Sequence, residues 1–331
     1  MGEEALRIGI IGTGGIAQAH LERLQGAPGT VIAALCDIDE KRAKATQAKF
    51  GGTIYGNFRE MLAREKPDLA FLCTPQMVRE EPIAACAKAG VPVFCEKPAA
   101  RDVETGKRIT RTVKEAGILV SVGFLFRYYR IVEKAKELLG KRPILAMNLY
   151  YQCGMMYPER RGRDFFYKKE LSGGLIVDQA IHLLDLTRHM LGEEIEEAHA
   201  YGSNLYQPKT ADITTEEAVV MGLRSKRGVP VSYMHTWLHQ SWQARMEIWA
   251  EKVYLAADMF KNVLTGVLDG MEISYAPGDD GMKTEDLVFL DAARKKDGRG
   301  IRSSYEDAVK SLALALAVSE SVDRGTPVKV A

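Results

Sequence analysis

The first 123 residues alternate short, nearly continuous apolar runs with longer amphipathic stretches. Runs typical of buried strands lie at Leu6–Ile11, Val31–Leu35, Leu69–Cys73, Val91–Cys95 and Ile118–Val122. Stretches of helical length lie between them, at Ile16–Gln25, Lys41–Phe50, Phe58–Glu65, Pro82–Ala89 and Val103–Glu115. Strands that are apolar on both sides are expected where helices cover both faces of a parallel sheet. The alternation therefore predicts a doubly wound α/β domain over residues 1–123.

The pattern changes after Gly123, where segments with the two-residue period of strands predominate. Strands are expected at Ile144–Gln152 and over 195–206, 213–223, 228–240, 244–250 and 252–256. Helices are expected over Tyr128–Leu139, Leu175–Leu191 and Tyr305–Asp323. Ser304 and Asp307 have the spacing of a capping box at the start of the last helix. Residues 124–331 are thus predicted to form a second, α+β domain on a largely antiparallel sheet.

Composition narrows the class of protein without naming a function. The chain has 331 residues, 45 Lys+Arg against 44 Asp+Glu, and 46% hydrophobic residues. This length suits two domains, each with a core of its own. A net charge of +1 provides no bulk field for a nucleic-acid backbone or an anionic membrane, so neither is expected as a partner.

Targeting and cysteine patterns favour a cytoplasmic protein. The longest apolar run, over 312–318, is far shorter than a membrane span, and the acidic N-terminus does not resemble a signal peptide. The five cysteines have no CxxC spacing, which argues against a disulfide framework and a zinc knuckle. The histidine pairs 182/189 and 235/239 lack the acidic or thiolate neighbours that a metal site needs, so no metal is expected.

A glycine-rich turn follows the first apolar run. Its sequence is Ile10-Ile11-Gly12-Thr13-Gly14-Gly15-Ile16-Ala17. Gly12 permits a tight turn, and Gly14 allows the backbone to approach a pyrophosphate. Gly15 and Ile16 lie at the start of the following helix, which presents free N–H groups and the positive end of its dipole. This arrangement predicts a dinucleotide site.

An acidic residue supports the same interpretation. Asp37 closes the second apolar run roughly 20 residues after the turn, the spacing of a carboxylate that binds a ribose 2′-OH. The alternative role for Asp37 is a helix N-cap, which Asp39 could fill instead. A carboxylate repels a 2′-phosphate, so NAD is favoured over NADP, although Arg42 lies one helical turn further on.

Three further segments resemble those of the Gfo/Idh/MocA oxidoreductases. They are Cys73-Thr74-Pro75, Glu96-Lys97-Pro98 and Gly173-Gly174-Leu-Ile-Val-Asp178-Gln-Ala-Ile-His182-Leu-Leu-Asp185. The resemblance implies a Rossmann domain with a nicotinamide cofactor bound near Thr74, Pro75, Glu96 and Lys97. It also implies a second domain with a large open-faced sheet, often used to form dimers or tetramers.

The resemblance implies Lys97, Asp178 and His182 as the catalytic group. Oxidation of a secondary alcohol releases a hydride and a proton, and histidine is suited to accept the proton near neutral pH. Asp178 precedes His182 by four residues, so both lie on one helix face. Lys97 follows a parallel strand and could stabilise alkoxide character. Taken singly, these residues could be a solvated lysine, a helix-terminal aspartate and a core histidine.

Two departures from the family pattern bear on the substrate. Ala180 stands where the family usually has glycine, and the stretch Gly123-Phe124-Leu125-Phe126-Arg127 lacks the proline common a few positions later. Candidate substrate contacts are Lys97, Asp178, His182, Arg127, Tyr157, Arg161 and Trp237. Arginines suit anionic groups and aromatic rings suit the apolar face of a sugar. The alternatives are a surface loop around 157–163 and a subunit interface at Trp237.

The expected function is that of an NAD(P)-dependent oxidoreductase. The expected substrate is a sugar, a sugar derivative or a cyclitol, and the expected assembly is a homodimer or homotetramer formed through the second-domain sheet. Two alternatives from the same family remain: a non-catalytic NAD(P)-sensing regulator and an NAD-dependent glycoside hydrolase. The intact Lys97, Asp178 and His182 argue against the regulator.

Overall fold

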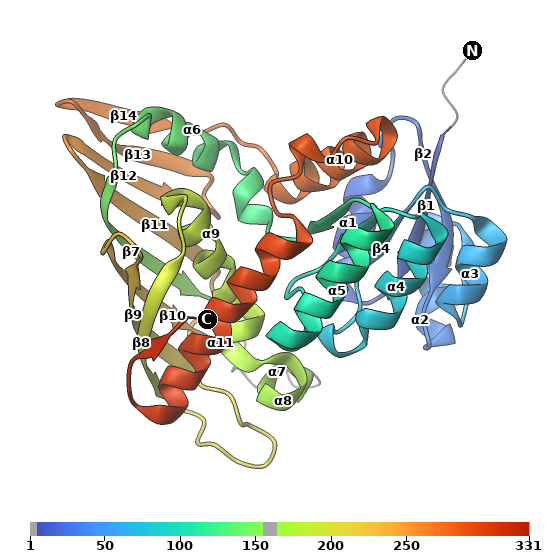
Figure 1. The fold of residues 1–331 in the computed structure, drawn as a ribbon, viewed down its shortest axis with the longest axis horizontal. Helices are drawn as coiled ribbons and strands as arrows, with labels where there is room; N and C mark the ends of the chain where they lie inside the picture. The colour runs from blue at the N-terminus through green and yellow to red at the C-terminus, as the bar shows by residue number, and fades with distance from the viewer. Residues whose placement is uncertain (1–4, 155–163, 331) are drawn as a thin grey trace. The chain divides into compact units, whose positions relative to one another are not determined.

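A six-stranded parallel sheet forms the centre of the first part of the chain (Figure 1). The computed structural model describes residues 5–154 and 164–330. The strand order is β3-β2-β1-β4-β5-β6, with β1 (Leu6–Ile11), β2 (Thr30–Cys36), β3 (Thr53–Tyr55), β4 (Leu69–Leu72), β5 (Val93–Cys95) and β6 (Val120–Val122). The order reverses between β1 and β4, where open α/β sheets bind ligands at the carboxyl ends of their strands. This confirms the doubly wound domain predicted from the sequence.

Helices cover both faces of this sheet (Figure 1). They are α1 (Gly15–Leu24), α2 (Glu40–Phe50), α3 (Phe58–Glu65), α4 (Glu80–Ala89) and α5 (Val103–Ala116). Asp39 caps α2 by accepting a hydrogen bond from the Arg42 amide, as the sequence allowed. All five predicted strands and all five predicted helices are present. The three-residue strand β3 was not predicted, since it is too short to show a period.

A segment from the C-terminal part of the chain belongs to the first unit. The chain divides into 1–123 with 282–309, and 124–281 with 310–331. The sequence analysis placed all of residues 124–331 in the second domain, whereas residues 282–309 belong to the first unit. The physical reason is burial: Phe289 of α10 (Gly281–Lys295) packs edge-on against Phe71 and Phe94, with ring centroids 5.9 and 5.7 Å away.

The second unit is built on a nine-stranded sheet of order β14-β13-β12-β11-β7-β10-β9-β8-β15. The strands are β7 (Ile144–Gln152), β8 (Ile195–Ser203), β9 (Ala218–Ser225), β10 (Pro230–Thr236), β11 (Gln243–Ala250), β12 (Val253–Asp258), β13 (Val263–Leu268), β14 (Met271–Tyr275) and β15 (Val328–Lys329). Among the described strands of this sheet, only β7 and β10 pair in parallel, so the prediction of a largely antiparallel sheet is confirmed. Strands β13, β14 and β15 were not predicted.

The two faces of this sheet differ. Helices α6 (Arg130–Leu139), α9 (Ile181–Leu191) and α11 (Tyr305–Arg324) lie along one face (Figure 1). The opposite face carries the exposed side chains of Tyr201, Val220 and Met234, which are direct cross-strand neighbours on β8, β9 and β10. The sheet is therefore open on one side, as the family resemblance implied.

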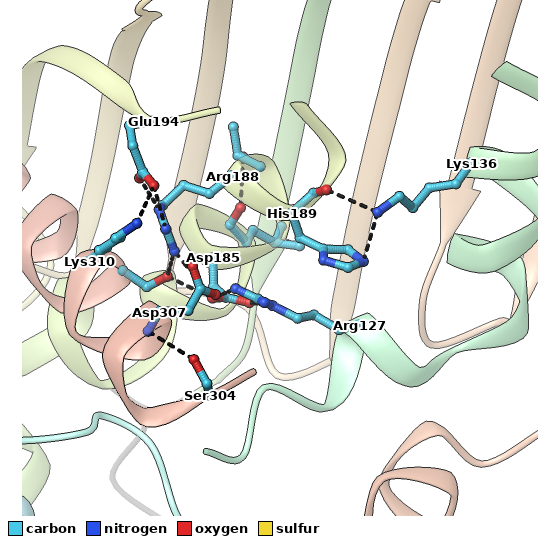
Figure 2. Close-up of polar contacts among 12 residues, drawn as sticks. Arg127, Lys136, Asp185, Arg188, His189, Glu194, Ser304, Asp307 and Lys310 are labelled. Carbon is cyan, nitrogen blue, oxygen red and sulfur yellow. Dashed lines mark hydrogen bonds and ion pairs between the residues drawn. The ribbon is translucent and has the colours of Figure 1, made fainter. Parts of the chain in front are cut away.

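The other helices in residues 5–154 and 164–330 are short. They are α7 (Asp164–Tyr167), α8 (Lys169–Ser172), a π-helical turn over Leu175–Ala180 that leads into α9, and 3₁₀ turns over Gln76–Val78, Leu125–Tyr128 and Gly298–Gly300. The single helix expected over 175–191 thus begins as a wider turn. The Asp307 amide donates to Ser304 Oγ at 3.3 Å at the start of α11 (Figure 2), as the capping pattern predicted.

No helix in the described part of the chain is long and apolar enough to cross a membrane. All five cysteines are buried and free of disulfide bonds.

A buried charge network anchors α9 in the second unit (Figure 2). Arg127 donates two hydrogen bonds to Asp185, at 2.7 and 2.5 Å, and both side chains are almost fully buried. Ser311 Oγ of α11 donates to Asp185 at 2.6 Å and accepts from Arg188. Arg188 also forms a two-pronged pair with Glu194. Arg127 therefore holds α9 through Asp185, a structural contact that the sequence analysis did not foresee.

We expect Arg127→Ala to lower the free energy of unfolding by about 3–5 kcal/mol, because it leaves the buried Asp185 carboxylate without its main partner. Chemical denaturation followed by circular dichroism measures this loss. The matched control is Arg130→Ala, which removes an exposed arginine of the same segment and should change stability by only about 0.5 kcal/mol. An Arg127→Ala protein of unchanged stability but raised KM would restore the substrate role.

Candidate active site

The turn between β1 and α1 accepts only glycine at position 12. Gly12 has φ +88°, and a Cβ built there would lie 2.8 Å from the carbonyl oxygen of Cys73. Its amide donates to the carbonyl oxygen of Cys36 at 2.8 Å. The turn is thus enclosed by the ends of β2 and β4, which brings the backbone to the edge where the strand order reverses.

The start of α1 has the form of an anion site. Gly14 is the N-cap residue, no side chain caps the helix, and its first turn carries no acidic residue. A Cβ at Gly14 or Gly15 would meet no atom within 4 Å, so open space adjoins these amides. Ile16 is 40% exposed at the same end of the helix. These residues fit the pyrophosphate of a dinucleotide.

Asp37 stabilises the glycine turn and retains capacity for a ligand. Its Oδ2 accepts hydrogen bonds from the amide and hydroxyl of Thr13 at 2.8 and 2.7 Å, and Oδ1 accepts from the Asp39 amide at 2.9 Å. Burial opposes ionisation, but these hydrogen bonds outweigh it and lower the pKa of Asp37. A carboxylate offers about four lone-pair positions, so Oδ1 can still accept from a ribose hydroxyl. The Arg42 guanidinium lies 3.7 Å from Asp37 and 3.3 Å from Asp39.

Arg79 holds the Glu96-Lys97-Pro98 loop together. Its guanidinium donates to the carbonyl oxygens of Glu96, Lys97 and Pro98, and also to that of Thr74 at 2.8 Å. The Lys97–Pro98 peptide bond is cis. Pro75 is exposed next to Thr74, and Lys97 is partly exposed. Arg79 was not identified from the sequence, where it is one arginine among many.

Glu96 lies over a buried histidine. Its Oε1 is 3.0 Å from His20 Nε2, and His20 Nδ1 is 2.8 Å from Asp286 of α10. Although burial by itself lowers the pKa of His20, the two carboxylates outweigh it and raise that pKa to about 9. His20 was missed by the sequence analysis. Its signal was a polar residue among the buried positions of α1, alongside Ala17, Leu21 and Leu24.

The second unit presents Asp178 and His182 on successive turns of one helical segment. Side chains at Gly173 and Gly174 would overlap Val177 and Thr215, so both glycines are needed where this segment starts. Asp178 lies in its first turn, as expected, and accepts a hydrogen bond from Gln179 at 2.9 Å. Tyr151 of β7 donates to the same Gln179 at 3.3 Å.

Aromatic rings surround His182. The ring centroid of Phe126 is 5.6 Å away and that of Phe124 6.3 Å away. Phe126 in turn contacts Tyr151 and the exposed Phe260, and Phe260 contacts the exposed Trp242 at 5.8 Å.

Other predicted substrate contacts differ from expectation. Trp237 is fully buried, so it presents no surface to a ligand, and the interpretation of this residue as a substrate contact is corrected. Tyr157 and Arg161 lie outside the described residues. Within residues 5–154 and 164–330, no group of three or more His, Cys, Asp or Glu side chains could hold a metal ion.

Comparison with known proteins identifies both parts of the chain. The family described as "Oxidoreductase family, NAD-binding Rossmann fold" matches residues 6–124, and the "GFO/IDH/MocA C-terminal domain" matches residues 144–256. Myo-inositol 2-dehydrogenase of Thermotoga maritima is 27% identical over 98% of both chains. D-glucoside 3-dehydrogenase of Escherichia coli is 28% identical, covering 58% of this chain and 56% of its own.

A solved structure shares the fold over its whole length. Scyllo-inositol dehydrogenase from Lactobacillus casei, with bound NAD(H) and scyllo-inositol, has a TM-score of 0.85 at 21% identity and covers 99% of both chains. The first family match contains the glycine turn and the Glu96-Lys97-Pro98 loop, and the second contains Asp178 and His182. The chain therefore belongs to the Gfo/Idh/MocA family of NAD-binding oxidoreductases.

Proposed function

We propose that this protein is an NAD(P)-dependent dehydrogenase or reductase that acts on a secondary alcohol or ketone of a sugar, a sugar derivative or a cyclitol. The single observation that carries the proposal is the glycine turn at the uncapped N-terminus of α1, which Asp37 stabilises by hydrogen bonds to Thr13. The inositol and glucoside dehydrogenases among the relatives support the substrate class. NAD is the preferred cofactor because the Asp37 carboxylate disfavours a 2′-phosphate.

The cofactor-binding residues proposed are Gly12, Gly14, Gly15, Ile16, Asp37, Thr74, Pro75, Glu96 and Lys97. The amides at the start of α1 hold the pyrophosphate, and Asp37 Oδ1 binds the adenosine ribose. When bound, the nicotinamide supplies the hydride-accepting carbon.

Lys97, Asp178 and His182 are the proposed catalytic group and the proposed contacts to the reacting substrate carbon. His182 accepts the hydroxyl proton of the alcohol, or donates it in the reverse direction. Asp178, held by Gln179, orients His182 and stabilises its charged form. The Lys97 ammonium hydrogen-bonds the same oxygen and stabilises its alkoxide character.

Lys97→Met and His182→Asn should each reduce kcat by about 10²–10⁴-fold, the usual contribution of a proton-transfer or charge-stabilising group. Both variants should still bind NADH, as measured by nicotinamide fluorescence. Turnover is measured with the substrate found in a panel of cyclitols, sugars and uronic acids, each tested with NAD and NADP by the change in nicotinamide absorbance. Lys88→Met, on an exposed face of α4, and His189→Asn, on α9, are the matched controls. Near wild-type turnover by Lys97→Met or His182→Asn would refute that residue's role.

The same panel separates the two alternatives. A glycoside hydrolase of this fold would consume glycosides without net accumulation of NADH, and a regulator would bind the cofactor without turnover of any compound.

Trp242 and Phe260 replace Trp237 as the proposed aromatic contacts to the substrate. Both are exposed, and the ring contacts through Phe126 link Phe260 to His182 within the second unit. An aromatic face suits the C–H face of a sugar or cyclitol ring.

We expect Trp242→Ala to raise KM by roughly tenfold, since losing one aromatic contact costs about 0.5–1.5 kcal/mol beyond its buried area. Trp242→Phe keeps a ring and should retain most of the affinity. Steady-state kinetics with the substrate found in the panel measures both. Equal KM values for Trp242→Ala and the wild type would exclude the contact.

The open face of the nine-stranded sheet is the proposed subunit interface of a homodimer or homotetramer. Tyr201, Val220 and Met234 form an exposed row across three strands, and Trp249 of β11 is exposed at 38%. A large apolar face of this kind is typical of protein interfaces. The free buried thiols suit a reducing compartment, and a cytoplasmic location is proposed.

We expect light scattering after gel filtration to give the mass of a dimer or tetramer of the 36.7 kDa chain. Val220→Glu should shift this mass towards the monomer, because it places a carboxylate in the middle of the apolar row. Leu205→Glu is the control, since Leu205 is 90% exposed outside the sheet. A wild-type monomer would contradict the proposal.

A further inference from the structure

A hydrogen-bond chain connects Asp178 to the sheet of the second unit. Gln179, in the π-helical turn Leu175–Ala180, stands between the two ends of this chain. Its Nε2 donates to Asp178 Oδ2 at 2.9 Å, and its Oε1 accepts from the hydroxyl of Tyr151 at 3.3 Å. Tyr151 on β7 and Gln179 on the turn thus lie in series behind the Asp178 carboxylate.

The side-chain amide of Gln179 has one favourable orientation between these partners. An ionised carboxylate only accepts hydrogen bonds, so Asp178 requires the NH2 end of the amide. The carbonyl end then faces Tyr151, whose hydroxyl can donate to it. Burial raises the pKa of Tyr151 well above its usual value, so this hydroxyl keeps its proton. Tyr151 therefore favours the amide orientation that offers a donor to Asp178.

The ring of Tyr151 is itself held by its neighbours. It is buried and packs edge-on against His235, its direct partner on β10, with ring centroids 4.7 Å apart. It also contacts Phe126 at 6.2 Å, and Phe126 contacts His182 at 5.6 Å. A phenylalanine could make these ring contacts equally well. Packing therefore accounts for the ring of Tyr151, and its hydroxyl is left with the hydrogen bond to Gln179.

We infer that Tyr151 is a positioning residue for Asp178: its hydroxyl fixes the side-chain amide of Gln179, and this amide holds the Asp178 carboxylate in the orientation used in the reaction. The inference rests on the proposed function, in which Asp178 belongs to the catalytic group. Every residue of the chain belongs to the second unit.

The test begins with Tyr151→Phe, Gln179→Met and the double variant of the full chain. Gln179→Met should lower kcat by about tenfold, the effect of losing one hydrogen bond to a charged group, and Tyr151→Phe by roughly threefold. The double variant should be no slower than Gln179→Met, because both substitutions remove the same support of Asp178. Losses that multiply in the double variant would contradict a chain through Gln179.

Two controls accompany these variants. NADH affinity should stay within about twofold of the wild type, since the glycine turn is untouched. Tyr55→Phe removes a hydroxyl that donates to Glu65 at 2.7 Å in the first unit, and its kcat should equal that of the wild type.

Gln179→Glu separates positioning from structural support. The new carboxyl group can still accept from Tyr151, but when ionised it repels Asp178. Two carboxylates so close share one proton, and the protonated group then donates to Asp178 as the amide does. The ratio of variant to wild-type kcat should therefore rise about fivefold or more as the pH is lowered from about 8 to about 5.5. Tyr129 and Cys153, which also act on Tyr151, are present in both proteins, so their effects cancel in this ratio.

The outcomes distinguish the inference from the proposed function. A merely structural role for Gln179 and Tyr151 predicts a ratio that does not change with pH, and that result would overturn the inference. A wild type that turns over none of the panel compounds contradicts the proposed function, and the inference falls with it. If the wild type is active and Tyr151→Phe and Gln179→Met keep its kcat, only the inference is wrong. Should Gln179→Met fail to fold by circular dichroism, Tyr151→Phe and Gln179→Glu decide, because each retains the shape of the native side chain.

Discussion

The structure depends on ionisable side chains that are buried and must therefore be paired. In the first unit, His20 stands between Glu96 and Asp286, and Arg79 closes the loop above them. In the second unit, Arg127 binds Asp185 with two hydrogen bonds beneath α9. Buried charges do not by themselves add much stability, but removing one partner is costly, so each cluster holds one arrangement of its segments. The segments so held carry the proposed catalytic residues.

These clusters relate the fold to the chemistry. Lys97 lies on the loop that Glu96 and Arg79 shape, and His182 lies on the helix that Asp185 anchors. A dehydrogenase needs little covalent chemistry from its protein, because the cofactor carries the hydride. What the protein must supply is a well-oriented proton acceptor and a well-placed positive charge. In the proposed mechanism, the Glu96-Lys97-Pro98 loop and α9, each held by paired charges, would supply these two groups.

The open face of the second sheet has a different physical basis. Its exposed row of apolar side chains crosses β8, β9 and β10, while the opposite face is covered by α6, α9 and α11. Antiparallel sheets tolerate one face without helices, whereas the parallel sheet of the first unit needs both faces covered. The parallel sheet therefore leaves only its edges for ligands, whereas the antiparallel sheet has one whole face without helices.

The sequence by itself determined much of this protein. The apolar runs of the first 123 residues predicted the doubly wound sheet, because strands covered on both sides are apolar throughout. The role of Gly12 in a tight turn was recognisable because turns and phosphate contacts depend on local backbone chemistry. The order of the motifs along the chain then indicated the family. The same local rules offered Asp39 as a possible cap of α2, and the structure has it there.

Only the tertiary structure decided which charges are partners. His20, Glu96 and Asp286 are separated by up to 266 residues, and no local pattern indicates that they meet. The pairing of Arg127 with Asp185 and the complete burial of Trp237 were equally absent from the sequence pattern. The sequence also gave no indication that residues 282–309 belong to the first unit. Helix α10 begins with glycine and carries scattered charges, so its pattern does not show which core it packs against. Pairing and burial arise from contacts between distant segments, and these depend on the complete fold.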